Sequence, residues 1–325
     1  MLTLQKVTLT CVILASAPVI AVPANSQSYP SRPVRIIVPN APASSGDIVA
    51  RLIAPQLSER LGQSVVVENR AGAGTMIGGE AVAKAPPDGY TLLMGFSTLA
   101  INPATYKKVP YDALRDFAPI TLVSSLPAVI AAHPSLPAKS VKELIALAKA
   151  RPDVIAFAST GQGTFSHATS ALFMSMAGIR MLHVPYKGTG PAVTAVLTGE
   201  VPLVSANVLS ALPHIRSGRL RALGITSTQR AATAPDIPTI AEAGLPGYES
   251  VQWLGLLAPA ATPPEIINRL HKEVVAVLRT PEMKDRLAKD GAESVGSSPA
   301  QFDTYIRSET TKWSKVLKAA GIEPQ

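Results

Sequence analysis

Cysteine is nearly absent from this chain of 325 residues, in which Cys11 is the only one. It lies in an N-terminal segment with a positive charge at Lys6, an uncharged and mostly apolar stretch over residues 7–22, and small residues around Ala24. This pattern predicts a signal peptide over residues 1–24 that is cleaved on export. The exported chain would hold no thiol, which excludes disulfides, thiolate metal sites and cysteine nucleophiles.

Further long apolar runs, aromatic side chains and blocks of like charge are also scarce. No other apolar stretch is long enough to span a bilayer, so we expect a soluble exported protein. Aromatic residues make up 5% of the sequence, which leaves little material for stacking nucleic-acid bases. The net charge of +8 is spread over single basic residues and short pairs. We therefore expect no nucleic-acid partner, whereas a mild positive field favours small anionic ligands.

Motifs for metals and cofactors are missing as well. The five histidines show no ligand spacing such as HExxH, so the sequence predicts no metal site. Gly72, Gly74 and Gly78 follow a predicted strand, but residues 68–71 lengthen the turn and no acidic residue ends the next strand. This departs from a dinucleotide fingerprint, and we predict no cofactor. An exported hydrolase or NAD(P)-dependent reductase stays an alternative, because catalytic groups need to meet only in space.

The sequence does contain an alternation of short β-branched runs and longer amphipathic segments, which is typical of an α/β fold with largely parallel sheets. The first half predicts a helix over residues 47–61 and strands over residues 34–39, 64–68 and 90–94. The second half predicts helices from residue 166 and over residues 191–197, with strands over residues 155–158, 181–184, 203–205 and 222–226. The pattern therefore repeats in two halves.

Two longer segments predict how these halves connect. A long strand over residues 123–132 and a return strand after Gly247 predict two crossings between two lobes. Lobe 1 would hold residues 29–124 and 248–325, and lobe 2 residues 125–247. The helices through residues 283–287 and 302–319 are expected to pack on lobe 1.

Helix ends carry recognisable signals in this chain. Ser140 is a predicted N-cap, and Glu143 three residues later predicts a capping box. Thr262 is predicted to cap a helix that begins with proline.

One loop in each half joins a strand to a helix through small residues. Loop 1 lies in "PNAPASSGDIVAR" (residues 39–51) and loop 2 in "ASTGQGTFSHATS" (residues 158–170). Bare amides at a helix start suit a carboxylate or a phosphate. Ser45 or Asp47 acting as a helix cap explains loop 1 without any ligand. Two such loops in one two-lobed chain favour a shared anion site.

Long ordered motifs give the sequence a family resemblance. These include "RLIAPQLSERLGQSVVVENRAGAG", "INPATYKKVPYDALRDFAPITLV" and "HVPYKGTGPAVTAVLTGEV", and the likeness covers essentially the whole mature chain. The chain resembles the solute-binding proteins of tripartite tricarboxylate transporters, the Bug family. The resemblance implies a two-lobe periplasmic binding protein fold of type II, with the ligand cleft between lobes and hinge closure around a small carboxylate. It also implies delivery to an inner-membrane permease and no catalysis.

The resemblance assigns residues to this function, and we expect a monomer in the periplasm. A sensor component for a receptor kinase remains a further alternative. Ligand binding is implied for Asn40, Ala41, Ser44, Ser45, Asp47, Ser97, Thr98, Ser159, Thr160, Gly161, Gly163, Thr164 and Ala206, with His167 and Asn207 in supporting positions.

The chain departs from the family pattern at three places. Asn40 stands where the family usually has Phe, and Ala43-Ser44 replaces a glycine pair. Ala206 stands where many members have Asp, a carboxylate that could pair with a ligand ammonium. We therefore predict an acid without a charged α-amino group near Ala206.

Overall fold

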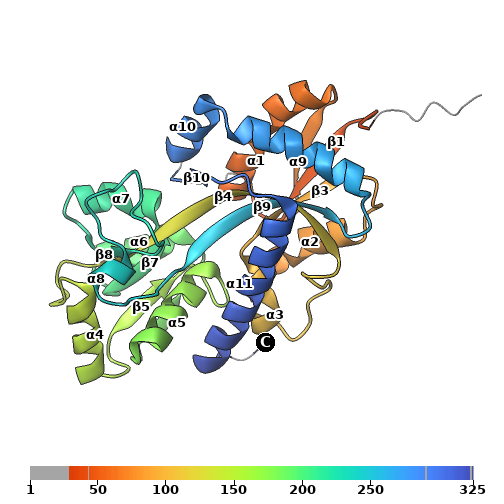
Figure 1. The fold of residues 1–325 in the computed structure, drawn as a ribbon. Helices are drawn as coiled ribbons and strands as arrows, with labels where there is room; N and C mark the ends of the chain where they lie inside the picture. The colour runs from red at the N-terminus through yellow and green to blue at the C-terminus, as the bar shows by residue number, and fades with distance from the viewer. Residues whose placement is uncertain (1–28, 43, 290, 323, 325) are drawn as a thin grey trace, which may run out of the picture.

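The computed structural model describes residues 29–42, 44–289, 291–322 and 324 of the chain. The predicted signal peptide and Ala43 lie outside these residues. Within them, no helix combines the length and apolar character needed to cross a bilayer. The elements form the expected α/β fold, in which one curved sheet runs through both halves of the molecule (Figure 1).

The first half of the sheet has the strand order β2-β1-β3-β9-β4. β1 (Val34–Val38) lies between β2 (Val65–Asn69) and β3 (Thr91–Phe96), and these three strands are parallel. β9 (Val251–Pro259) runs antiparallel to β3 and to β4 (Phe117–Ala132), and β10 (Glu293–Ser294) pairs with β4. Because β1 and β3 are parallel, their carboxyl ends meet at one edge of the sheet.

The second half of the sheet continues from β4 in the order β4-β7-β5-β6. β5 (Ala156–Ser159) is parallel to both β6 (Leu182–Pro185) and β7 (Leu203–Asn207). β7 and β8 (Arg221–Ile225) each pair antiparallel with the last part of β4. The carboxyl ends of β5 and β7 therefore also share an edge.

The long strand β4 links the two halves. Its 16 residues pair first with β9 and then with β7 and β8. Figure 1 shows β4 and β9 running side by side from one half to the other. This arrangement agrees with the two crossing strands expected from the sequence, while the lobe boundaries stay predictions. The sequence also predicts a hinge within these crossings, near residues 123–125 and 248–252.

Helices cover the sheet in both halves. The first half carries α1 (Ser45–Leu61), the short η1 (Ala73–Thr75), α2 (Met76–Ala83), α3 (Thr98–Thr105), α9 (Pro264–Leu278) and α10 (Pro281–Lys289). The second half carries α4 (Val141–Ala150), α5 (Phe165–Ala177), α6 (Thr189–Leu197), α7 (Val208–Arg216) and α8 (Ile240–Ala243). The sequence did not predict α3 or α7, each of which contains an internal proline that ordinarily argues against a helix.

The last helix, α11 (Pro299–Ala319), contacts both halves of the molecule (Figure 1). It packs on α3 and β4 and also on α5, where Trp313 meets the Phe165 ring edge-on at a centroid distance of 6.3 Å. The helix therefore packs on the first half, as expected from the sequence, and also reaches α5 in the second half. The indole of Trp313 is large enough to reach Phe165 of α5, so the contact surface of α11 extends into the second half.

Two predicted helix caps need correction. Ser140 does cap α4, and its Oγ accepts from the Glu143 amide at 3.2 Å. The Glu143 carboxylate accepts instead from the Lys139 amide at 2.7 Å, so the reciprocal bond of a capping box to Ser140 is not made. Thr262 is not the cap of α9, because Pro263 takes that position and the Thr262 hydroxyl donates to the Pro259 carbonyl.

Gly255 offers a test of how closely α11 packs on β9. A Cβ at this position would lie 2.0 Å from Cζ of Phe302, whose side chain is fully buried. We expect Gly255→Ala to lower the free energy of unfolding by about 1–3 kcal/mol, the usual cost of overpacking a core. Urea denaturation measures this, with Gly190→Ala as the control because nothing lies within 4 Å of a Cβ there. Equal midpoints for the two variants would contradict the packing.

Candidate ligand-binding site

A cavity of about 660 Å³ lies between the two halves of the sheet. The first half contributes the segments that follow β1 and β3, and the second half those that follow β5, β6 and β7. Leu126 and Pro127 of β4 and Gln252 of β9 line it where the strands cross. The wall therefore combines both halves with the strands that connect them.

The described residues of the cavity wall carry no charged side chain and no histidine. Apolar contacts come from residues such as Ile48, Phe96 and Phe165. Hydroxyls and amides supply the polar groups, from Asn40, Ser44, Ser45, Thr75, Ser97, Thr98, Thr160, Thr164, Ser166, Thr189, Ser205, Asn207, Ser210 and Gln252. Any recognition of charge by these residues must therefore come from dipoles and hydrogen bonds.

Six helices begin at this wall, namely α1, α2, α3, α5, α6 and α7. Five of them, all except α1, have no side-chain hydrogen bond at the N-cap. Away from the cavity, α4, α8 and α11 are capped by Ser140, Thr239 and Ser298, whereas α9, with Pro263 at its N-cap, has no side-chain cap. Uncapped amides and the positive ends of helix dipoles thus converge on the cavity, which suits an anion.

Loop 1 is shaped by a cap and by a close approach of backbone to side chain. Ser44 is the N-cap of α1, since its Oγ accepts from the Asp47 amide at 3.4 Å, so neither Ser45 nor Asp47 has that role. A Cβ on Gly46 would lie 2.2 Å from Cζ of Phe96, so only glycine lets α1 start this close to the end of β3. Asp47 is buried and forms an ion pair with Arg51 at 2.9 Å.

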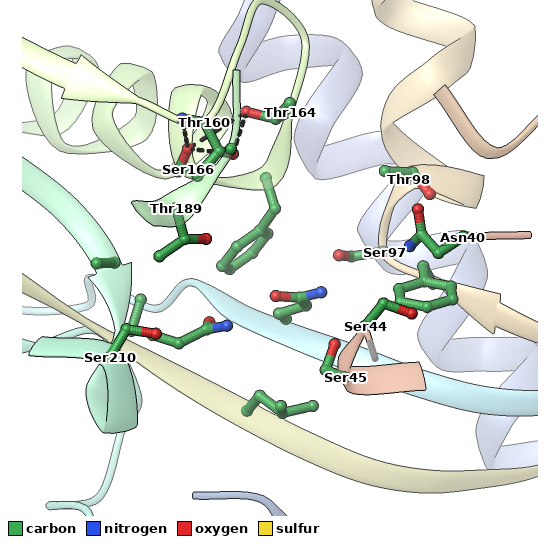
Figure 2. Close-up of a pocket in the computed structure, with 18 of the residues that line it drawn as sticks. Asn40, Ser44, Ser45, Ser97, Thr98, Thr160, Thr164, Ser166, Thr189 and Ser210 are labelled. Carbon is green, nitrogen blue, oxygen red and sulfur yellow. Dashed lines mark hydrogen bonds between the residues drawn. The ribbon is translucent and has the colours of Figure 1, made fainter. Parts of the chain in front are cut away.

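Loop 2 is held by hydrogen bonds among its own hydroxyls (Figure 2). The Thr160 hydroxyl lies 3.1 Å from that of Thr164 and 2.9 Å from that of Ser166. Ser166 also accepts from the Thr160 amide at 2.8 Å, and Thr164 donates to the Gly161 carbonyl at 2.7 Å. These bonds give loop 2 a defined shape before any ligand arrives.

Two stacked histidines support loop 2 from behind. The rings of His167 and His183 lie 3.9 Å apart and are nearly parallel. Nδ1 of His167 accepts from the Gly163 amide at 3.2 Å, while Nε2 of His183 lies 2.6 Å from Oγ of Ser159. Burial and the neighbouring His183 lower the pKa of His167 to about 3, and burial lowers the pKa of His183 to about 4. Both rings are therefore neutral near pH 7.

Two buried hydroxyls of the wall stand out because neither has a hydrogen-bond partner among the residues that the structure describes. Ser97 follows β3 and Ser205 lies in β7, and each is 1% exposed. Ser124 has an equally unpartnered hydroxyl but does not line the cavity. A buried hydroxyl without a partner costs about 1–3 kcal/mol, and this cost is recovered when a partner arrives.

The structure brings most of the predicted site residues together and places the others behind them. Ser45 and Thr160, from opposite halves, line the same cavity, and Figure 2 shows their loops on different sides of it. The predicted residues in the wall are Asn40, Ala41, Ser44, Ser45, Ser97, Thr98, Thr160, Thr164, Ala206 and Asn207. Those outside the wall are Asp47, Ser159, Gly161, Gly163 and His167.

The residues outside the wall act on the shape of the loops. Gly161 and Gly163 have φ of 135° and 69°, values that glycine adopts readily. Asp47, Ser159 and His167 are buried, and each is hydrogen-bonded to a neighbouring residue of its loop or helix. Direct contact of Asp47, Ser159, Gly161 and Gly163 with a ligand stays a prediction from the sequence, as does the supporting role of His167.

Several residues of the wall were missed by the sequence analysis. Gly188 and Thr189 open α6 after β6, and Ser210 lies in the first turn of α7. The sequence could have indicated Gly188 and Thr189, because residues 184–189 have the same pattern as loops 1 and 2, namely the end of a strand, small residues and the start of a helix. The positions of Gln252 and Ser205 could not be foreseen, since strand pairing alone brings them to the cavity.

One serine and one histidine of loop 2 and its support lie within hydrogen-bonding distance of each other. The Ser159–His183 hydrogen bond resembles part of a hydrolase site, but Ser159 is fully buried and does not line the cavity. The described residues also contain no group of three or more side chains that could hold a metal ion. The groups that the described wall does offer are neutral hydrogen-bond donors and acceptors.

The fold and this cavity define a two-lobe solute-binding protein. The family described as "tripartite tricarboxylate transporter family receptor" matches residues 49–322, and the chain belongs to this family. It is 40% identical to "Protein BugT" of Bordetella pertussis over 306 residues, covering 94% of each chain. The expected family and the expected fold class are both confirmed.

Solved structures of relatives agree with this assignment. "R. palustris Rpa4515 with adipate" is 36% identical, with a TM-score of 0.80 over 91% of this chain and 100% of that one. The periplasmic binding protein BugD is also 36% identical, with a TM-score of 0.76 and the same coverage. MatC from Rhodopseudomonas palustris with bound malate is 32% identical, with a TM-score of 0.74 over 89% of this chain and all of that one.

The histidine pair predicts a stability that depends on pH. In the unfolded chain a histidine takes up a proton near pH 6.5, whereas His167 and His183 in the folded protein stay neutral down to about pH 3 and 4. Between these values the unfolded state binds more protons, so stability is full above pH 6.5 and falls as the pH is lowered towards 4.

Thermal unfolding between pH 7 and pH 4 measures this effect. We expect a His183→Asn variant to lose less stability over that range than the wild type, because one titrating group is removed. His133→Asn, outside the pair, serves as the control. The interpretation fails if His183→Asn and the wild type fall in parallel.

Proposed function

We propose that this chain is a periplasmic solute-binding protein that captures a small carboxylate between loop 1 and loop 2 and delivers it to a tripartite tricarboxylate-type permease. One observation supports this most strongly: five helices begin at an uncharged cavity without a side-chain cap. Such N-termini offer amides and a partial positive charge to an anion. No charged side chain of the protein has to lose its hydration for this.

The energies are adequate for a useful affinity. Micromolar binding requires about 8 kcal/mol. A hydrogen bond to a charged group contributes about 1.5–3 kcal/mol, and each helix dipole about 0.3–1 kcal/mol. A carboxylate that receives four or five such bonds in a closed cavity therefore reaches that range without any salt bridge.

The class of ligand follows from the wall and from the relatives. Rpa4515 is described with adipate and MatC with malate, and both ligands are small carboxylates. The described wall has no acidic side chain, so a ligand ammonium would lose its hydration without gaining a counter-charge. We propose a di- or tricarboxylic or aromatic acid without an α-amino group.

Closure of the two halves completes the proposed mechanism. β4 and β9 connect the halves beside the cavity, where Leu126 pairs with Gln252, and small rotations there would open or close it. Closure removes water from the bound carboxylate and strengthens its hydrogen bonds. Since only the closed form would present both halves in one geometry, the permease could distinguish loaded from empty protein.

Calorimetry and turnover assays test this proposal together. We expect saturable binding to one or more members of a panel of mono-, di-, tricarboxylic and aromatic acids, and a higher melting temperature with the same compounds. Incubation with carboxylate esters or with NADH should give no turnover. Ester or NADH consumption, or a panel that produces no binding, would refute a carboxylate carrier.

Ala206 provides a test of how the wall selects charge. It lines the cavity and is 3% exposed, directly before the N-cap of α7. We expect Ala206→Asp to weaken binding of the preferred carboxylate at least tenfold relative to Ala206→Asn, because a second negative charge would face the ligand. The Asn variant matches Asp in size and controls for crowding. Equal affinities of the two variants in calorimetry, or aspartate and glutamate as the best wild-type ligands, would contradict this view.

A further inference from the structure

Part of the cavity wall in the second half is supported from behind by α11. Phe165 is the first residue of α5, lines the cavity and is buried. The fully buried indole of Trp313 in α11 meets the Phe165 ring edge-on at a centroid distance of 6.3 Å. α11 follows β10, which pairs with β4 in the first half, so this contact joins segments of both halves (Figure 1).

A buried carboxylate holds the indole in this orientation. Glu309 is 3% exposed, and its Oε2 accepts a hydrogen bond from Nε1 of Trp313 at 2.9 Å, one helical turn further along α11. Its other oxygen forms an ion pair with Nζ of Lys312, which also lies 4.8 Å from the centroid of the indole ring. The indole is therefore fixed both at its N–H edge and at one face.

The burial of Glu309 is not explained by the indole alone. Removing a carboxylate from water costs several kcal/mol unless close partners compensate, so acidic residues are rarely buried. The second tryptophan, Trp253, has a buried Nε1 with no partner among the described residues, so an indole in this fold does not require a carboxylate. Trp253 packs on Phe302 and Tyr305, neither of which lines the cavity. What distinguishes Trp313 is its contact with the cavity wall.

The position of Phe165 also sets where α5 begins. Thr164, the N-cap of this helix, makes no side-chain hydrogen bond to the first amides, because its hydroxyl bonds within loop 2. A displaced Phe165 ring would shift the first turn of α5 and the bare amides that face the cavity. The Trp313 indole therefore acts on the anion-binding end of α5, although no residue of α11 lines the cavity.

The two halves approach each other closely on this side of the molecule. A Cβ on Gly163 of loop 2 would lie 3.3 Å from Cβ of Thr105, the last residue of α3. α11 packs on α3 in the first half and on α5 in the second. Because these helices belong to different halves, a rotation about β4 and β9 changes the distances among them.

We propose that Glu309 and Trp313 are positioning residues, which hold Phe165 and the start of α5 in the geometry that receives the anion and couple ligand binding to α11. This inference rests on the proposed capture of a carboxylate. It assigns control of affinity to two residues outside the cavity wall. It also makes α11 a third connection between the halves, beside β4 and β9.

Variants of α11 separate positioning from general stability. We expect Trp313→Phe, which lacks the indole N–H, and Glu309→Leu to weaken binding of the best acid of the panel by about fivefold or more in calorimetry below their melting temperatures. Glu309→Gln keeps a hydrogen-bond acceptor and should bind about as tightly as the wild type.

Glu273→Leu is the matched control for these variants. Glu273 of α9 is 6% exposed and pairs with Arg60 and Arg269, so its loss should lower the melting temperature and leave the affinity unchanged. Wild-type affinity of both Trp313→Phe and Glu309→Leu would refute the positioning role. An equal loss of affinity in Glu273→Leu would show that the effect is merely structural.

The fluorescence of Trp313 tests the coupling without relying on a loss of affinity. In a Trp253→Phe variant, Trp313 is the only tryptophan of the chain. We expect the best-binding acid to change its emission with a midpoint equal to the Kd from calorimetry. Adding Phe165→Leu should reduce the change even at saturating ligand. Unchanged emission at saturation, or a change that Phe165→Leu does not reduce, overturns the coupling and leaves the carrier intact. Absence of binding by every acid overturns both.

Discussion

Unsatisfied amides at helix N-termini are the constraint on which this molecule depends. Five helices begin at the cavity without a side-chain cap, while α4, α8 and α11, which begin elsewhere, each use a serine or threonine. Leaving amides bare lowers the stability of the empty protein, because each N–H then relies on water. The same amides become strong donors when an anion replaces that water. The affinity for an anion is thus obtained at some loss of stability in the unliganded protein, and no charged side chain is needed.

The sheet explains why so many helices can begin at one place. Parallel strands end at a common edge, and each is followed by a helix that starts there. β1 and β3 supply one such edge, β5, β6 and β7 the other, and β4 with β9 holds the two edges facing each other. Loop 2 is stiffened by its own hydroxyl network and the stacked histidines, so little conformational entropy remains to be lost when a ligand binds.

Loop 1 shows how polar groups of the first half reach the cavity. Ser44 caps α1 and also lines the cavity, and Asn40 lines it beside the apolar side chains of Ile48 and Phe96. In the second half Ala206 and Asn207 line the cavity, and no acidic side chain stands in the described wall. Both halves therefore face the cavity with neutral groups.

The sequence by itself determined the α/β class, most of the strands, the family and the two loops, because these depend on local patterns of apolar residues, glycines and small polar side chains. It could not determine that Asp47 and Ser159 lie behind the wall or that Asn207 lines it, since their direction depends on packing between distant segments. It also could not find Ser205 or Gln252, which strand pairing brings to the cavity. Only the tertiary structure decides which polar groups remain without a partner, because the packing of distant segments sets which donors and acceptors meet and which are buried.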